Sequence, residues 1–327
     1  MSDVASAFAD GIRLNWMPGI NEVSRPRYAS VAEWLSKGAY DWLAPIGTVF
    51  RLDITRVSID FSEALASEIS RFSCAAYESL LDAIFDASPI RALGWPLIRH
   101  YYATFYCSHA LLRINGISLT YISVEIANKL NKIGGQYLGF LPQLTGGLYR
   151  IERDKVHRQT LLLEKISSGG GSHEDMWKRF LAFLIDTENA IISSLGSLPA
   201  ALEAVRVSTQ LRAHLCRSGK NDGAWPSSIR NAINYRQDFD VWYPYKRSEA
   251  AALKLSNRMN HWRPSDPLAF DIGQGRDDLS CFADLCKVVA QILTASLQDI
   301  SARSPRAGQC FVDQHPFKLL RQRQIAV

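Results

Sequence analysis

The sequence predicts a mainly α protein, a helical bundle that carries one small β-hairpin insert. Apolar residues recur at the spacing of an amphipathic helix along most of the chain after residue 60. One short stretch, near 147–166, instead reads as two strands, GGLYRIERD and TLLLEKI, around a charged link. The chain has 327 residues, of which 47% are hydrophobic and 21% charged. That is enough apolar material for a substantial core, and it excludes disorder as the main state.

Three parts are predicted along the chain. An irregular N-terminal segment (1–60) precedes a single helical domain with the hairpin insert (61–302), and a basic C-terminal tail (303–327) follows. Within the first part we expect only a short amphipathic helix around Val31–Trp42 and a strand at Val49–Ile54. No repeat or low-complexity tract divides the chain further.

The helical domain begins with its clearest periodic segment, 61–85, which ends before Ser88-Pro89. A second helix is predicted over 97–114 and a third over 118–133, because Gly116 and Gly134-Gly135 end them. Further helices are expected over the ranges 174–195, 199–216, 227–235, 248–259 and 277–300. SSGGGSHED is the strongest loop signal, and Ser172 within it is a candidate helix cap. We expect the apolar stripes of the long helices to face one shared core.

Standard catalytic and metal-binding motifs are missing from the sequence. It contains no GxxxxGK(S/T), GxGxxG, HExxH or GxSxG, and its seven histidines show no metal-ligand spacing. His173-Glu174 is typical of the first turn of a helix. We interpret His100 and His109 as histidines of the core. The six cysteines are scattered, which is typical of reduced thiols. We therefore expect no metal and no cofactor.

The location predicted from the sequence is the cytoplasm. No continuous apolar run reaches the roughly 20 residues of a membrane helix. The N-terminus also lacks the basic start and apolar stretch of a signal peptide. We therefore expect no contact with a membrane.

Positive charge is concentrated in the C-terminal third of the chain. The net charge is +5, yet residues 206–263 hold eleven Lys and Arg against four acids, and residues 303–323 hold five against one. Aromatic residues are interleaved with the first group: Trp225, Tyr235, Phe239, Trp242, Tyr243, Tyr245 and Trp262. Bases between stacking rings are typical of surfaces that bind single-stranded nucleic acid. The alternative is a solvated face on which arginines cover buried rings.

Two segments resemble a known family. RHYYATFYCSHALLRINGI (99–117) resembles the tyrosine-rich helix of many HEPN domains, and Arg230-Asn231 in SSIRNAINYRQDFDVWYPY (227–245) resembles the start of the HEPN R-x4–6-H motif. Together the segments cover about a ninth of the chain. The resemblance implies a helical bundle that commonly dimerises. It also implies a role as, or derived from, a metal-independent ribonuclease of toxin–antitoxin, CRISPR-linked or other antiviral defence systems.

The sequence departs from the family motif at the catalytic histidine. The positions where that histidine should fall are Tyr235, Arg236 and Gln237. Only Arg150 and His157 have the motif's spacing, and they lie in the predicted hairpin, so we attribute that match to chance. Standard HEPN catalysis is therefore not expected.

The candidate catalytic residues are Arg230, Asn234 and Tyr235. Metal-free RNA cleavage needs a base for the 2′-hydroxyl, an acid for the leaving oxygen and a cation for the developing charge. Arg230 and Arg236 could supply the cation, and Asn231 or Asn234 could orient a phosphate. Tyr235, with an ordinary pKa of about 10, is a poor base near neutral pH. His214 or His261 could replace the missing histidine if the fold brings either one close.

The candidate nucleic-acid-binding residues are Arg230, Asn231, Arg236, Trp242, Tyr245, Lys246, Arg247, Arg258 and Arg263. Three functions remain open. The first is a HEPN-like nucleic-acid-binding or scaffolding subunit of a prokaryotic defence or toxin-type system, without standard catalysis. The second is an active metal-independent ribonuclease with a non-standard site, and the third is a helical protein–protein interaction module. The expected partners are RNA or single-stranded DNA, a protein partner, and a second copy in a homodimer. A histidine imidazole beside Arg230 would separate the second function from the first.

Overall fold

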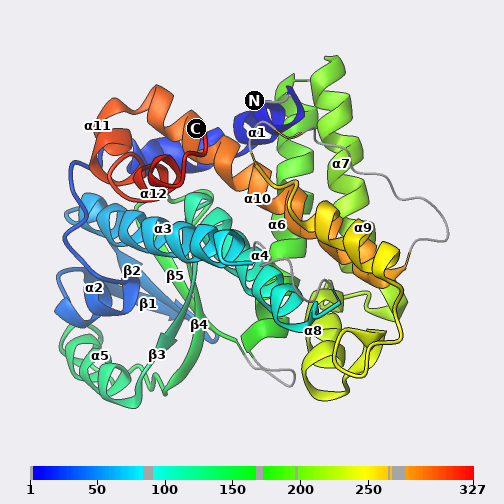
Figure 1. Cartoon of the computed structure of the whole chain (residues 1–327). Helices are drawn as coiled ribbons and strands as arrows, with labels where there is room; N and C mark the ends of the chain where they lie inside the picture. Colours follow the sequence, from blue (N-terminus) through cyan, green and yellow to red (C-terminus); the bar gives the residue numbers. More distant parts are fainter. Residues whose placement is uncertain (1–2, 84–90, 167–171, 196–197, 264–265, 267–276) are drawn as a thin grey trace.

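The computed structural model describes residues 3–83, 91–166, 172–195, 198–263, 266 and 277–327. The fold is mainly helical, as predicted, and a small antiparallel sheet lies at one side of the helices (Figure 1). One continuous hydrophobic cluster includes Leu65, Leu97, Phe180 and Leu293, so the long helices share a core as expected.

Three long helices form the centre of the molecule: α3 (Ser58–Leu81), α4 (Gly94–Ile114) and α10 (Asp278–Arg303). Within the described part of the chain, α10 alone is long and apolar enough to cross a membrane. However, 94% of its most apolar 18-residue window is buried inside the protein. The sequence analysis expected no such apolar segment. The burial identifies α10 as the core helix of this fold.

The predicted hairpin exists, but it is the middle of a larger sheet. β4 (Gly147–Arg153) and β5 (Thr160–Lys165) pair with each other. β5 also pairs with β2 (Val49–Asp53), which pairs with β1 (Asp41–Ile46), and β4 pairs with β3 (Ile117–Ile122). All pairs are antiparallel, in the order β1-β2-β5-β4-β3.

β3 corrects the predicted helix over 118–133. The β-branched residues of ISLTYI favour a strand, and β4 supplies its hydrogen-bonding partner. The helix that follows, α5 (Val124–Leu138), begins only after Ser123, whose hydroxyl accepts a hydrogen bond from the Ile126 N–H at 3.2 Å.

The N-terminal segment is not irregular. Residues Asp3–Ile20 form α1, which is kinked at Pro18-Gly19, and Val31–Lys37 form α2. α1 buries Phe8, Ile12 and Trp16, which recur every four residues and so lie on one face. The sequence analysis missed this period because only a few large apolar residues mark it.

The C-terminal helices follow their predictions closely. They are α6 (Ser172–Leu195), α7 (Pro199–Leu215), α8 (Trp225–Tyr235) and α9 (Glu249–Met259), with 3-10 turns at Arg217–Gly219 and Asp238–Asp240. The last residues of the predicted loop SSGGGSHED (167–175) belong to α6, whereas residues 167–171 and the side chain of Ser172 lie outside the described residues.

The basic tail is folded rather than extended. It forms α11 (Pro305–Ala307), a π-helical turn (Gly308–Val312) and α12 (Pro316–Gln322). α12 packs on α3 and buries Phe317 and Leu320, so this segment contributes to the core (Figure 1).

Candidate functional site

One face of α4 carries a row of side chains that joins two polar clusters. Tyr101, Phe105, His109 and Arg113 follow one another at intervals of four residues, so they share a face of the helix. Phe105 separates the two histidines of the region, with ring centroids 4.6 Å from His109 and 4.4 Å from His173.

The first cluster surrounds the hydroxyl of Tyr101, which is fully buried. This hydroxyl lies 2.9 Å from Nδ1 of His173 and 3.2 Å from the hydroxyl of Ser227, and it accepts a hydrogen bond from the Trp177 indole N–H at 3.3 Å. His173 and Trp177 come from the first turns of α6, and Ser227 from the start of α8. The hydroxyl therefore ties three helices together.

Arg230 completes this cluster from the next turn of α8. Its guanidinium carbon lies 5.6 Å from the ring centre of Tyr101 and 5.8 Å from that of Tyr235. One of its terminal nitrogens donates to the Asn231 side-chain oxygen at 2.7 Å. No carboxylate of the described residues pairs with it, and its Nε is buried without a partner among them. The cluster thus holds one cation that no acid of the described residues neutralises.

Burial and the charge of Arg230 lower the pKa of His173, so its imidazole is neutral at pH 7. Burial raises the pKa of Tyr101, so its phenol stays protonated. A neutral imidazole can accept a proton, and an unpaired guanidinium beside it can stabilise a phosphate. These are two of the groups that metal-free phosphodiester cleavage needs.

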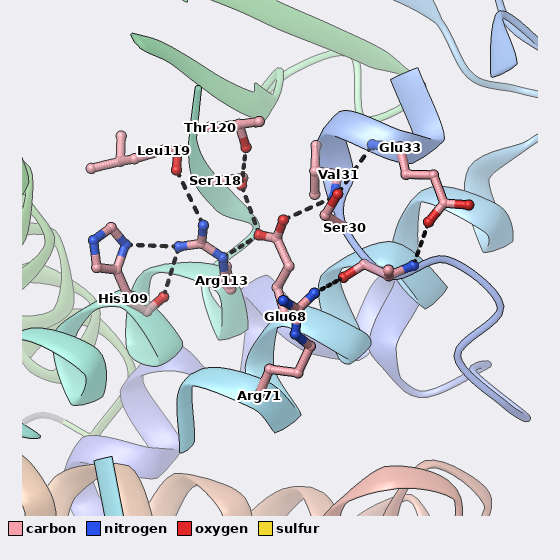
Figure 2. Close-up of polar contacts among 11 residues, drawn as sticks. Ser30, Val31, Glu33, Glu68, Arg71, His109, Arg113, Ser118, Leu119 and Thr120 are labelled. Atoms are coloured by element: carbon pink, nitrogen blue, oxygen red, sulfur yellow. Dashed lines mark hydrogen bonds and ion pairs between the residues drawn. The ribbon is translucent and has the colours of Figure 1, made fainter. Parts of the chain in front are cut away.

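The second cluster is a buried ion pair between Arg113 and Glu68 (Figure 2). Their side chains are only 2% and 8% exposed. Arg113 also donates to Nδ1 of His109 at 2.9 Å and to the Leu119 carbonyl at 3.2 Å. Glu68 accepts from the Val31 N–H at 2.9 Å. The pair therefore connects α2, α3, α4 and β3, and its donors and acceptors are used inside the protein.

A cavity of about 350 Å³ lies beside this ion pair, lined by Ser30, Glu68, Arg71, Phe72, Ala75 and Tyr106. Arg71 is held by the carbonyl of Ala29 (Figure 2). Among the described residues, no group of three or more His, Cys, Asp or Glu could hold a metal ion.

The predicted site residues of α8 are found on its exposed side. Asn231, Asn234, Tyr235 and Arg236 are all exposed. Arg236 forms an ion pair with Asp238 at 3.1 Å, and both side chains face solvent. These residues are therefore open to a ligand.

The predicted aromatic residues after α8 are anchored to it. The Trp242 indole N–H donates to the carbonyl of Ile233 at 2.7 Å, and its ring meets Trp95 edge-on at 5.6 Å. Tyr245 packs edge-on against Tyr243 at 5.9 Å. Lys246 follows and is exposed.

The remaining predicted binding residues lie elsewhere. Arg258 pairs with the buried Asp284 of α10 at 2.6 Å, so its charge is neutralised inside the protein. Arg258 and Arg247 line a separate cavity of about 410 Å³. Arg263 is exposed, and its backbone carbonyl accepts from Gln291 of α10 at 3.0 Å. The basic stretch 206–263 thus supplies more than one surface.

The sequence analysis did not find the partners of Arg230. His214 lies buried on α7 and His261 follows α9, whereas the histidine whose pKa responds to Arg230 is His173. Two aromatic residues in the sequence could have indicated this cluster. They are Tyr101, in the double tyrosine, and Trp177, one turn after His173.

Arg150 and His157, which match the HEPN spacing by chance, lie outside the cluster around Tyr101. Arg150 lies on β4 and pairs with Glu152 at 2.6 Å, and His157 is exposed in the hairpin turn.

Neither protein-family models nor curated proteins nor solved structures give a significant match to this chain. Its function is therefore inferred from the geometry of its own residues.

Proposed function

We propose that the protein binds single-stranded nucleic acid, RNA foremost, on the α8 surface, which we define as Trp95, Arg230, Tyr235, Arg236, Tyr243 and Lys246. The observation that carries the proposal is three exposed rings among cations. Trp95, Tyr235 and Tyr243 are 64%, 71% and 84% exposed. Large rings left in water beside bases suit stacking on nucleobases, which contributes about 1–3 kcal/mol per base.

Contacts of the neighbouring residues support a single surface. Trp242 touches Trp95 and is held to α8 through Ile233. The Gly94 N–H donates to the Val241 carbonyl at 3.3 Å, which fixes the start of α4 against the same segment. Arg236 can exchange its exposed partner Asp238 for a phosphate at little cost, because exposed ion pairs contribute less than about 1 kcal/mol.

A HEPN-like core is the second part of the proposal. The two segments that resemble the family, 99–117 and 227–245, meet where Tyr101 contacts Ser227 and Arg230. This convergence supports a common site built from them. From the resemblance we further propose a subunit of a prokaryotic defence or toxin-type system, cytoplasmic, homodimeric and in contact with a protein partner.

A metal-independent ribonuclease is the second candidate function, and the observation that supports it is His173, whose pKa is lowered by burial and by the charge of Arg230. In this reaction His173 would take the proton of a ribose 2′-hydroxyl through Nε2. The 2′-oxygen would then attack the phosphorus, and the bond from phosphorus to the 5′-oxygen would break as that oxygen takes a proton from water. His173 would afterwards return its own proton to water. The products would be a 2′,3′-cyclic phosphate and a 5′-hydroxyl end. Arg230 would stabilise the extra negative charge on the phosphate oxygens.

Tyr101 would be a positioning residue in this reaction. To leave Nε2 free as a base, Nδ1 of His173 must carry the proton and donate it to the Tyr101 oxygen. The Tyr101 hydroxyl would then donate to Ser227, 3.2 Å away. The three side chains would thereby fix the tautomer in which His173 accepts a proton.

The binding test is a titration of a labelled single-stranded RNA at two salt concentrations. Arg230→Ala with Arg236→Ala should weaken binding at least tenfold, and the salt dependence should fall by about 0.7 per lost phosphate contact. The matched control is Lys318→Ala with Arg323→Ala, which removes the same charge from exposed positions at the C-terminus. Equal losses in both double variants, or none in the first, would contradict a binding role for the α8 surface.

Cleavage is followed in the same samples with EDTA present. A 2′,3′-cyclic phosphate product that disappears in His173→Asn, while RNA binding is kept, would establish the ribonuclease. Tyr235→Phe should leave cleavage unchanged. If the wild-type protein binds the RNA but leaves it intact, the ribonuclease function is excluded and the binding function is retained.

A further inference from the structure

A second charged cavity lies away from the α8 surface. It has a volume of about 340 Å³ and is bordered by α1, the turn between α4 and β3, the β4–β5 hairpin and α6. The residues that bear on its chemistry are Asn15, Asn115, Arg150, Arg153, Lys155 and Arg158. A cavity of this size falls in the range that holds small organic ligands.

The acids of this cavity are already engaged. Glu152 pairs with Arg150 at 2.6 Å, and Asp186 pairs with Lys155 at 3.2 Å. Asp154 accepts the backbone N–H groups of two residues of the hairpin turn, each at 2.8 Å. These pairs account for two of the four cations that line the cavity.

Arg153 forms no hydrogen bond or ion pair with a carboxylate of the described residues, and the charge of Glu22 acts on it only from a distance. Its guanidinium donates to the hydroxyl and carbonyl of Ser58 at 3.1 Å, to the Ser62 hydroxyl at 3.0 Å and to the Arg158 carbonyl at 3.2 Å. It also lies 5.4 Å from the ring centre of Phe61. All of these partners are neutral. Burial lowers the pKa of Arg153 to about 10, so the group remains charged at neutral pH.

Arg158 is the second cation without an acidic partner among the described residues. It is exposed and donates one hydrogen bond, to the Leu14 carbonyl at 3.3 Å. Beside it, the Asn15 side-chain NH₂ donates to the Asn115 oxygen, which leaves the NH₂ group of Asn115 as a donor. The cavity therefore combines a fixed buried charge, an available guanidinium and an available amide.

We propose that this cavity binds the phosphate group of a phosphomonoester. Arg158 and Asn115 donate hydrogen bonds to the phosphate oxygens, and Arg153 supplies a fixed positive charge behind them. The four cations and three carboxylates of the lining leave one net positive charge for a phosphate anion, and the planar guanidinium donors suit its oxygens. The cavity exceeds the size of inorganic phosphate, so a mononucleotide or the terminal phosphate of a nucleic acid strand fits this chemistry. The site is independent of the α8 surface.

The test uses adenosine 5′-monophosphate and adenosine, with calorimetry and thermal unfolding at constant ionic strength. The monophosphate should bind saturably and raise the melting temperature, and adenosine should do neither. Arg158→Gln should lose at least tenfold in affinity without a loss of stability, because Arg158 is exposed. The matched control Arg323→Gln, an exposed arginine at the C-terminus outside both sites, should bind the monophosphate as the wild type does.

Two short RNAs distinguish the sources of the phosphate. If a 5′-phosphorylated RNA binds more tightly than its 5′-hydroxyl form and only Arg158→Gln removes the difference, the ligand is a strand end. If the monophosphate binds and the two RNAs bind alike, the ligand is a free nucleotide. The proposed phosphate site would be overturned if adenosine and its monophosphate bound with the same affinity. It would also be overturned if Arg158→Gln bound both the monophosphate and the phosphorylated RNA as tightly as the wild type does. The proposed binding of RNA by the α8 surface is tested separately, by the affinity of the Arg230→Ala/Arg236→Ala variant for the 5′-hydroxyl RNA.

Discussion

Tyr101 shows how one buried hydroxyl gathers a site from distant parts of the chain. Its contacts with His173 and Ser227 span 72 and 126 residues of sequence. No spacing rule connects residues so far apart, and therefore Arg230 could be named from the sequence while its histidine could not. In the sequence, His173 could be explained by the start of α6 alone, and only the packing of the helices reveals its contact with Tyr101.

The histidines around α4 make stability depend on pH. Burial lowers the pKa of His100, His109 and His173 below the ordinary value of about 6.5. The pKa of His109 is lowered furthest, by burial first and then by the charge of Arg113. As the pH falls below about 6.5, the unfolded chain takes up protons that the folded protein does not. The free energy of unfolding therefore decreases toward acid.

Urea unfolding at pH 7.5 and 5.5 measures this effect. We expect each of these histidines that stays neutral in the folded protein to lower the free energy of unfolding at pH 5.5 by up to about 1.4 kcal/mol. His109→Gln should reduce the difference between the two pH values by up to that amount. Equal stability of the wild type at both pH values, or an unchanged difference in His109→Gln, would contradict the assignment.

At the scale of elements, the Arg113–Glu68 ion pair joins helices and sheet. Its hydrogen bonds reach the start of α2 through Val31 and the strand β3 through Leu119 (Figure 2). Removing one partner leaves a buried charge without compensation, which typically costs 3–5 kcal/mol. The same interaction places His109 and, through Phe105, the helix face next to His173.

Arg113→Met should therefore lower the free energy of unfolding by about 3–5 kcal/mol, because Glu68 keeps a buried charge. Arg113→Met with Glu68→Gln should be less destabilised than the sum of the two single variants, which a double-mutant cycle measures. Arg206→Met, which breaks the half-exposed pair with Glu203, is the control and should cost less than about 1 kcal/mol. Additive effects in the cycle would show that the pair is not coupled.

Helices with strong periodicity could be predicted from the sequence, and segments decided by tertiary pairing could not. α10 and α3 carry continuous apolar stripes, so their places followed from the spacing. The segment ISLTYI is compatible with the start of a helix and with a buried strand. It forms the strand β3 because β4 pairs with it. Likewise, Arg258 belongs to a basic stretch in the sequence, but Asp284 neutralises it in the fold.

At the scale of the whole molecule, two charged sites lie on different elements. The α8 surface is formed by α8, the segment after it and the first turn of α4, and the cavity of about 340 Å³ by α1, the turn between α4 and β3, the β4–β5 hairpin and α6. The charge count of the sequence pointed to residues 206–263, and only part of that stretch reaches the α8 surface. The cavity combines residues whose local net charge is small, so composition gave no sign of it.

Hydrogen exchange with and without a single-stranded RNA tests the central claim most directly, because it locates the binding surface without a mutation. The account predicts slower exchange in α8 (225–235), in residues 241–247 and at the start of α4. These changes should be absent when the Arg230→Ala/Arg236→Ala variant is used under the same conditions. RNA that binds the wild type but slows exchange only elsewhere, with α8 and residues 241–247 unchanged, would contradict it.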